Sequence, residues 1–195
     1  MNRIGNTIAT FILLAASSQA GIITYTAVLN GVNESPTNSS LGTGFTTVVF
    51  NNVTNTLSVN VTFTGLTGTT TASHIHCCTA VALTGTAGVA TETPTFGGFP
   101  LGVTSGTYSN LYDLTLLASW NTPFVTANGG TAAGAEAAFA AGLAGGKAYL
   151  NIHSSFAPGG EIRGFLVATP EPATWGLIGA SLLALGAARK RLQKQ

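Results

Sequence analysis

Residues 57–64 read Leu57-Ser58-Val59-Asn60-Val61-Thr62-Phe63-Thr64, a strict alternation of apolar and polar side chains. Successive side chains of a β-strand point to opposite faces, so the alternation predicts a strand with one face in a core and one in water. Residues 23–29 and 44–50 are rich in β-branched and aromatic side chains, which favour strands. The turn Asn51-Asn52 suits a hairpin leading into 57–64.

The strand pattern runs to about residue 126 and includes a further strand over residues 108–116. Abundant Gly and Thr, with few long helical periods, predict an all-β fold. We expect an antiparallel Greek-key β-sandwich, immunoglobulin-like or Cu/Zn superoxide dismutase-like. One short Ala-rich helix is predicted over residues 132–144, capped by Thr131 and stopped by Gly145-Gly146.

Charge is scarce in the body of the chain. Residues 21–168 hold two positive and five negative side chains, and the other five Lys and Arg of the 195-residue sequence lie at its ends. With no basic patch to neutralise phosphates, nucleic acid is excluded as a partner. Arg163 is one of the two positive residues, so we expect it to be partly buried and paired with Asp113 or Glu161.

The N-terminal residues 1–20 have the pattern of a secretory signal peptide. Arg3 precedes an apolar run over residues 8–16, and Ser18-Gln19-Ala20 forms a small-x-small site, so we expect cleavage after Ala20. The alternative is an uncleaved membrane helix, but the run is shorter than the ~20 residues of a span. Export would place the cysteines in an oxidising compartment.

The three histidines of the chain are its best chemical clue. His74 and His76 are two residues apart in a strand-like run, so their side chains share a face. His153 ends a second strand-like run over residues 147–153. Imidazoles in this arrangement can bind copper or zinc, so we expect the three rings to converge. A hydrogen-bonded cluster in the core is the alternative.

Cys77 and Cys78 directly follow His76. Adjacent Cα atoms lie about 3.8 Å apart across a trans peptide, which is short for a disulfide. A Cys77–Cys78 bridge, two free thiols, bridges to other chains and a thiolate that joins the histidines on a metal all remain open.

Two motifs in order resemble the CHRD family, named from the animal protein chordin. The closing one comprises residues 148–154, the loop residues Pro158-Gly159-Gly160 and then residues 161–164, and His74-Ile75-His76 matches the earlier histidine pair. The resemblance covers residues 23–168. It implies a secreted β-sandwich without an established catalytic role. The chain departs from the family where Cys77-Cys78 replaces the glycine-containing turn expected after the pair.

The C-terminal segment resembles a PEP-CTERM sorting signal. Pro170-Glu171-Pro172 is followed by an apolar helix over residues 173–188 and a basic end, which the positive-inside rule keeps cytoplasmic. The resemblance implies processing by an exosortase in a Gram-negative bacterium after transient anchoring in the inner membrane. A permanent anchor is the alternative. The expected domains are residues 1–20, a CHRD-like domain over 21–168, and the sorting signal over 169–195.

We therefore expect an exported, surface- or matrix-associated, noncatalytic protein that binds polysaccharide or surface proteins in the extracellular polysaccharide or biofilm layer. Four aromatic side chains offer a binding surface: Tyr108, Tyr112, Trp120 and Tyr149. The alternative is a copper- or zinc-binding protein, including a superoxide dismutase-like oxidoreductase.

Overall fold

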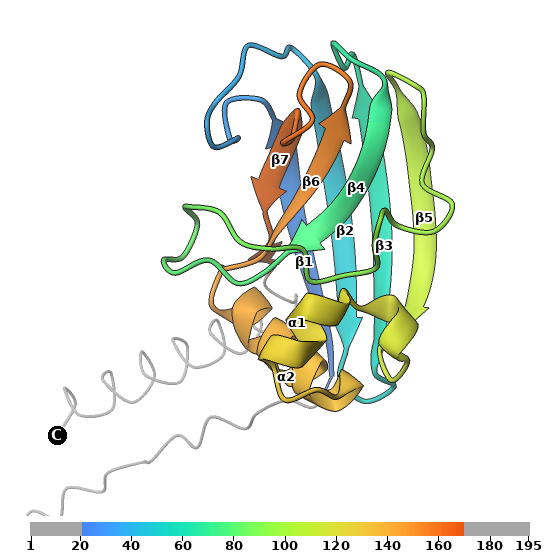
Figure 1. The fold of residues 1–195 in the computed structure, drawn as a ribbon, viewed down its shortest axis with the longest axis vertical. Coiled ribbons are helices and arrows are strands. Elements are labelled where there is room, and N and C mark those ends of the chain that lie inside the picture. Colours follow the sequence, from blue (N-terminus) through green and yellow to red (C-terminus); the bar gives the residue numbers. More distant parts are fainter. Residues whose placement is uncertain (1–20, 170–195) are drawn as a thin grey trace, which may run out of the picture.

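The computed structural model describes residues 21–169 as one antiparallel sheet with helices at one end (Figure 1). The strands are β1 (Ile22–Asn30), β2 (Thr43–Asn51), β3 (Thr56–Thr64), β4 (Thr70–His76), β5 (Gly106–Asp113), β6 (Tyr149–Ser154), β7 (Ile162–Phe165) and β8 (Val167–Ala168). The helices are the 3₁₀ turn η1 (Leu117–Ser119), α1 (Thr122–Ala127) and α2 (Ala132–Ala144). The predicted strands at 23–29, 44–50 and 57–64 are confirmed, and the one predicted at 108–116 ends at Asp113.

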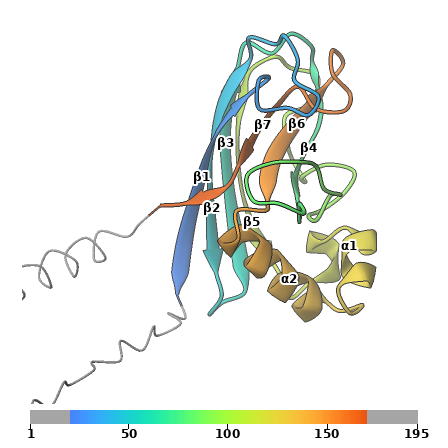
Figure 2. The same ribbon diagram turned by 90° about the vertical axis from the view of Figure 1, so that its left-hand side faces the viewer.

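The strand order is β4-β6-β7-β1-β2-β3-β5, with β8 also paired to β1. β1, β2 and β3 pair along their full lengths, whereas β7 meets β1 through the single residue pair Asn30 and Arg163. The sheet curls at this narrow junction, so β4 and β6 form a second layer that faces β1, β2 and β3 (Figure 2). The all-β prediction is confirmed. The two layers of the expected sandwich are two parts of one curled sheet, because β7 joins them.

The core lies between the two parts of the curled sheet. Leu57, Val59, Val61 and Phe63 are all buried, as the alternation in β3 predicts. Ile75 of β4 and the alternate β6 residues Leu150 and Ile152 are fully buried. The opposite face of β4 and β6 is left for the polar residues at the intervening positions.

Helix α2 has the predicted bounds, and the side chain of Thr131 accepts a hydrogen bond from the Gly134 N–H at 3.1 Å. Phe139 of α2 packs edge-on against Trp120, which closes this end of the core. The strand pattern predicted to run to about residue 126 is wrong at its end, because residues 122–127 form helix α1. No helix of residues 21–169 is long and apolar enough to span a bilayer. The predicted signal peptide and membrane helix lie outside the described residues.

Candidate metal centre

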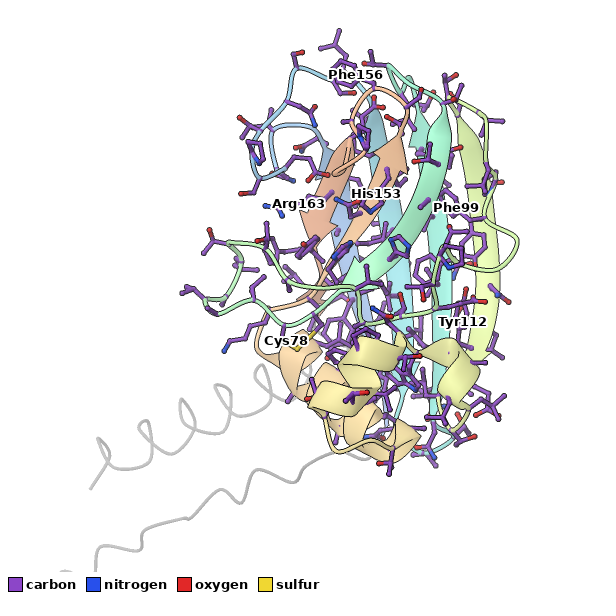
Figure 3. The ribbon with its side chains drawn as sticks, in the orientation of Figure 1. Cys78, Phe99, Tyr112, His153, Phe156 and Arg163 are labelled. Carbon is purple, nitrogen blue, oxygen red and sulfur yellow. A yellow bond between two sulfur atoms is a disulfide. The ribbon has the colours of Figure 1, made fainter. Side chains whose placement is uncertain are left out.

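Two neighbouring strands place the three histidines on one face of the sheet. In the antiparallel pairing of β4 with β6, His74 is opposite Asn151, and His76 is opposite Tyr149. Cross-strand partners share a face, and His153 lies two residues beyond Asn151 on that same face. His153 on β6 and Arg163 on the adjacent β7 lie on this side of the sheet in Figure 3.

The three imidazoles converge as predicted. Their ring centroids are 5.8 Å apart for His74 and His76, 5.2 Å for His74 and His153, and 5.9 Å for His76 and His153. One nitrogen from each ring lies within 4.8 Å of the others. Tetrahedral zinc with bonds of about 2.0–2.1 Å needs its nitrogens roughly 3.4 Å apart. Small side-chain rotations that move each nitrogen by about 1 Å would bring the three to this spacing.

Each ring uses its other nitrogen to contact a backbone carbonyl. His74 Nε2 lies 2.6 Å, His76 Nδ1 2.9 Å and His153 Nδ1 2.8 Å from the carbonyl oxygens of Pro94, Ala87 and Pro158 respectively. A carbonyl oxygen only accepts, so these ring nitrogens carry the proton and donate it. The remaining nitrogens, His74 Nδ1, His76 Nε2 and His153 Nε2, are therefore unprotonated in the neutral rings, with their lone pairs free. This is the tautomer arrangement that metal-ligating histidines adopt.

Burial keeps the rings neutral. It lowers the pKa of His74, of His153 and, to about 4, of His76. The carbonyl contacts oppose this effect without cancelling it, and neighbouring rings lower the pKa of His74 and His76 further. At neutral pH all three imidazoles are thus ready to bind a cation without first losing a proton.

The inner nitrogens have no hydrogen-bond partner. Among residues 21–169, His74 Nδ1, His76 Nε2 and His153 Nε2 are three of the four buried side-chain N or O atoms that lack one. Buried polar atoms are almost always paired, because an unmade hydrogen bond costs about 1–3 kcal/mol. Three such atoms on three converging rings are donors that a bound cation would satisfy.

The cysteines are not among the converging donors. Cys77 and Cys78 are bonded to each other in a disulfide, and the metal-capable group comprises the histidines alone. The disulfide packs on α2, where a Cβ at Gly142 would overlap both sulfurs (Figure 3). Glycine at this position lets the helix backbone approach the bridge.

A stack of side chains supports His76 from behind. The Tyr149 ring lies parallel to the His76 ring with centroids 4.8 Å apart, and the Arg163 guanidinium lies 4.7 Å from the Tyr149 centroid. The Tyr149 hydroxyl donates to the same Ala87 carbonyl that contacts His76. The stacked Tyr149 ring and the Ala87 carbonyl together fix the orientation of the His76 ring. No pattern in the sequence indicates this role for Tyr149.

Arg163 is buried, as expected, but its predicted partner is wrong. Its Nε lies 3.7 Å from Glu34 Oε2, and the two side chains are 4% and 5% exposed. It also donates hydrogen bonds to the carbonyls of Asn33 and Gly85. Glu161 instead forms separate hydrogen bonds, so Arg163 ties two loops to the histidine face. The acidic partner was missed because Glu34 comes from a loop distant in sequence.

The aromatic binding surface expected from Tyr108, Tyr112, Trp120 and Tyr149 is wrong. All four side chains are buried. Tyr108 and Tyr112 share a hydroxyl hydrogen bond of 2.7 Å, and the Trp120 indole donates to the Leu114 carbonyl. Their polar ends are satisfied inside the protein, so these rings stabilise the core.

Comparison with known families identifies the fold and the tail. The CHRD domain matches residues 25–166, which is most of the chain, and the protein belongs to this family. Residues 168–191 match the PEP-CTERM protein-sorting motif. This motif implies export, a membrane-anchored sorting signal in Gram-negative bacteria and processing by an exosortase. No curated protein and no solved structure matches the chain significantly.

Proposed function

We propose that this exported CHRD-domain protein binds one divalent transition-metal ion, zinc or copper, through His74, His76 and His153. The observation that carries the proposal is that the two nitrogens of each imidazole ring have different surroundings. One nitrogen donates to a backbone carbonyl, the other is buried and unpartnered, and the three rings converge. A hydrogen-bonded core cluster would instead pair its inner nitrogens.

Metal analysis of untagged protein tests the proposal. We expect one zinc or copper ion per chain, and we expect His153→Ala to weaken binding beyond the ~10–100-fold typical of losing a residue behind the ligands. Asn60→Ala is the control, because Asn60 lies on β3, away from the histidines, and is partly exposed. Wild-type protein that takes up no ion would leave the core cluster as the explanation.

We further propose that the ion is not catalytic and that the protein is a binding or structural module of the extracellular polysaccharide or biofilm layer. The sorting motif supports a surface location, and the burial of the inner nitrogens supports a noncatalytic ion, because a substrate would have to reach them. The alternative is a superoxide dismutase-like oxidoreductase.

A superoxide decay assay separates the two. Because zinc does not change oxidation state, the protein is loaded with copper, and superoxide should then decay no faster with it than in buffer containing chelated copper. Decay that the wild type accelerates and His153→Ala does not would support the oxidoreductase. The surface role predicts that the protein sediments with the polysaccharide fraction of its host and is released when that polysaccharide is digested.

A further inference from the structure

The fourth unpartnered buried side-chain N or O atom of the described residues is Asn151 Oδ1, and its residue belongs to the same strand pair as the three histidines. Asn151 is 2% exposed and lies on β6 opposite His74, two residues from His153. Its side chain therefore projects from the face that carries the histidines. All four atoms that lack a partner come from this one face of β4 and β6.

Glu34 fixes which way the Asn151 amide points. Asn151 Nδ2 donates to Glu34 Oε1 at 2.8 Å. In the ionised form that pairs with Arg163, Glu34 accepts and does not donate, so a flipped amide would place two acceptors against each other. Glu34 itself is held by the Arg163 ion pair. The amide oxygen must consequently point away from Glu34.

The backbone at Gly160 leaves the amide little room to swing. A Cβ at this position would overlap Asn151 Nδ2 and would approach Glu34 Oε1 within 2.7 Å. Gly160 has a φ of 136°, which is open to glycine and strained for other residues. The side of the amide that faces Glu34 is thus closely packed, and Oδ1 keeps one orientation with no protein donor to meet it.

We propose that Asn151 Oδ1 is the fourth donor to the ion, which completes a set of three nitrogens and one oxygen supplied by the protein alone. This inference rests on the proposed metal site. An amide oxygen is a hard donor, so the set favours a divalent ion such as Zn²⁺ over the soft cuprous ion. A site filled by four protein donors holds no exchangeable water, as structural zinc sites do not, whereas catalytic ones keep an open position.

Cobalt and azide test this donor set. Co²⁺ replaces Zn²⁺ in the untagged protein and gives visible bands that change when azide binds the metal. We expect the Co²⁺ spectrum of the wild type to be intense, four-coordinate and unchanged by azide. Asn151→Ala should bind Co²⁺ at least ~10-fold more weakly and should become azide-sensitive, because water or azide takes the empty position. Asn60→Ala should behave as the wild type.

The possible outcomes distinguish the fourth donor from the metal site itself. Wild-type protein that binds no Co²⁺ or Zn²⁺ overturns both. Stoichiometric Co²⁺ with an azide-sensitive wild-type spectrum keeps the histidine site and overturns Asn151 as its fourth donor. Asn151→Ala protein that binds Co²⁺ as tightly as the wild type does the same. The wild-type spectrum decides the question even if Asn151→Ala does not fold.

Discussion

Replacing Glu161 by glutamine would test the most heavily hydrogen-bonded charge in the core. Glu161 is fully buried. Its Oε1 accepts from the Ser40 hydroxyl and the Thr67 N–H, and its Oε2 accepts from the Ser154 hydroxyl and the Gly68 N–H. These bonds join the loops before β2 and β4 to the closing hairpin of β6 and β7.

The magnitude follows from the donors. Glutamine keeps the shape of Glu161 but turns one carboxylate oxygen into an NH₂ group. In either orientation one backbone N–H, from Thr67 or Gly68, then faces another donor, whereas a hydroxyl can rotate. An unsatisfied buried N–H costs about 1–3 kcal/mol, and the remaining bonds lose their charged acceptor, so we expect a loss of about 3 kcal/mol. With an m-value of about 2 kcal/mol/M, the urea midpoint falls by roughly 1.5 M.

The effect should depend on pH in a defined direction. Burial alone would raise the pKa of Glu161, but the four hydrogen bonds outweigh it and hold the pKa below the ordinary 4.5. A carboxyl group with a depressed folded pKa stabilises fully above its unfolded pKa, and this stabilisation is lost as pH falls through the folded pKa. The difference between wild type and Glu161→Gln should therefore be largest near pH 7 and shrink below pH 4.

Urea unfolding at pH 7 and at pH 3 would measure both effects. Glu136→Gln is the matched control, because Glu136 lies partly exposed on α2 with no hydrogen bond or ion pair from its side chain among residues 21–169. Its midpoint should stay within about 0.3 M of the wild type. A Glu161→Gln midpoint equally close to the wild type at pH 7 would refute the reasoning.

Three further changes have defined outcomes. Burial raises the pKa of Glu34 to about 7 despite the opposing charge of Arg163. At pH 8 Glu34 is therefore charged, and Arg163→Ala should lower the free energy of unfolding by about 3 kcal/mol because it leaves this charge without its partner. A loss under 1 kcal/mol in urea unfolding would instead indicate a solvated pair. Gly142→Ala should lower the Tm by about 5 °C through overlap with the disulfide, whereas Gly88→Ala, where a Cβ meets open space, should not; equal melting curves would contradict this. Glu171→Ala should retain the C-terminal tail in a host with an exosortase, as intact mass would show, and a full-length wild type there would leave a plain anchor.

Much of the fold could be predicted because local pattern and burial agree. The alternation over residues 57–64 predicts the strand and its buried face, and the two-residue spacing of His74 and His76 predicts their shared face. Helix α1 was missed because β-branched residues favour a strand locally, and packing of Phe124 on Trp120 overrides that preference.

The support of the candidate site could not be predicted, because it is made by tertiary contacts. Glu34 and Asn151 are 117 residues apart in sequence, and their hydrogen bond depends on where a loop folds back onto β6. The register that sets Asn151 opposite His74 is likewise invisible in a single chain. Sequence spacing determines which residues share a strand face, whereas the loops that cover that face decide which atoms are left unpaired.

The short strand β8 determines how the domain would bear mechanical load. The sorting motif begins at residue 168, within β8, so tension from a membrane anchor enters the domain there. β8 contributes only two residue pairs with β1, and Thr169 adds hydrogen bonds to the Thr24 carbonyl. Under a pull these contacts would separate first and release about 10 Å of chain over residues 167–169. The load would then pass through Leu166 to β7, which forms four residue pairs with β6 beside the histidine face. The contacts of β8 would therefore yield before force reaches that face.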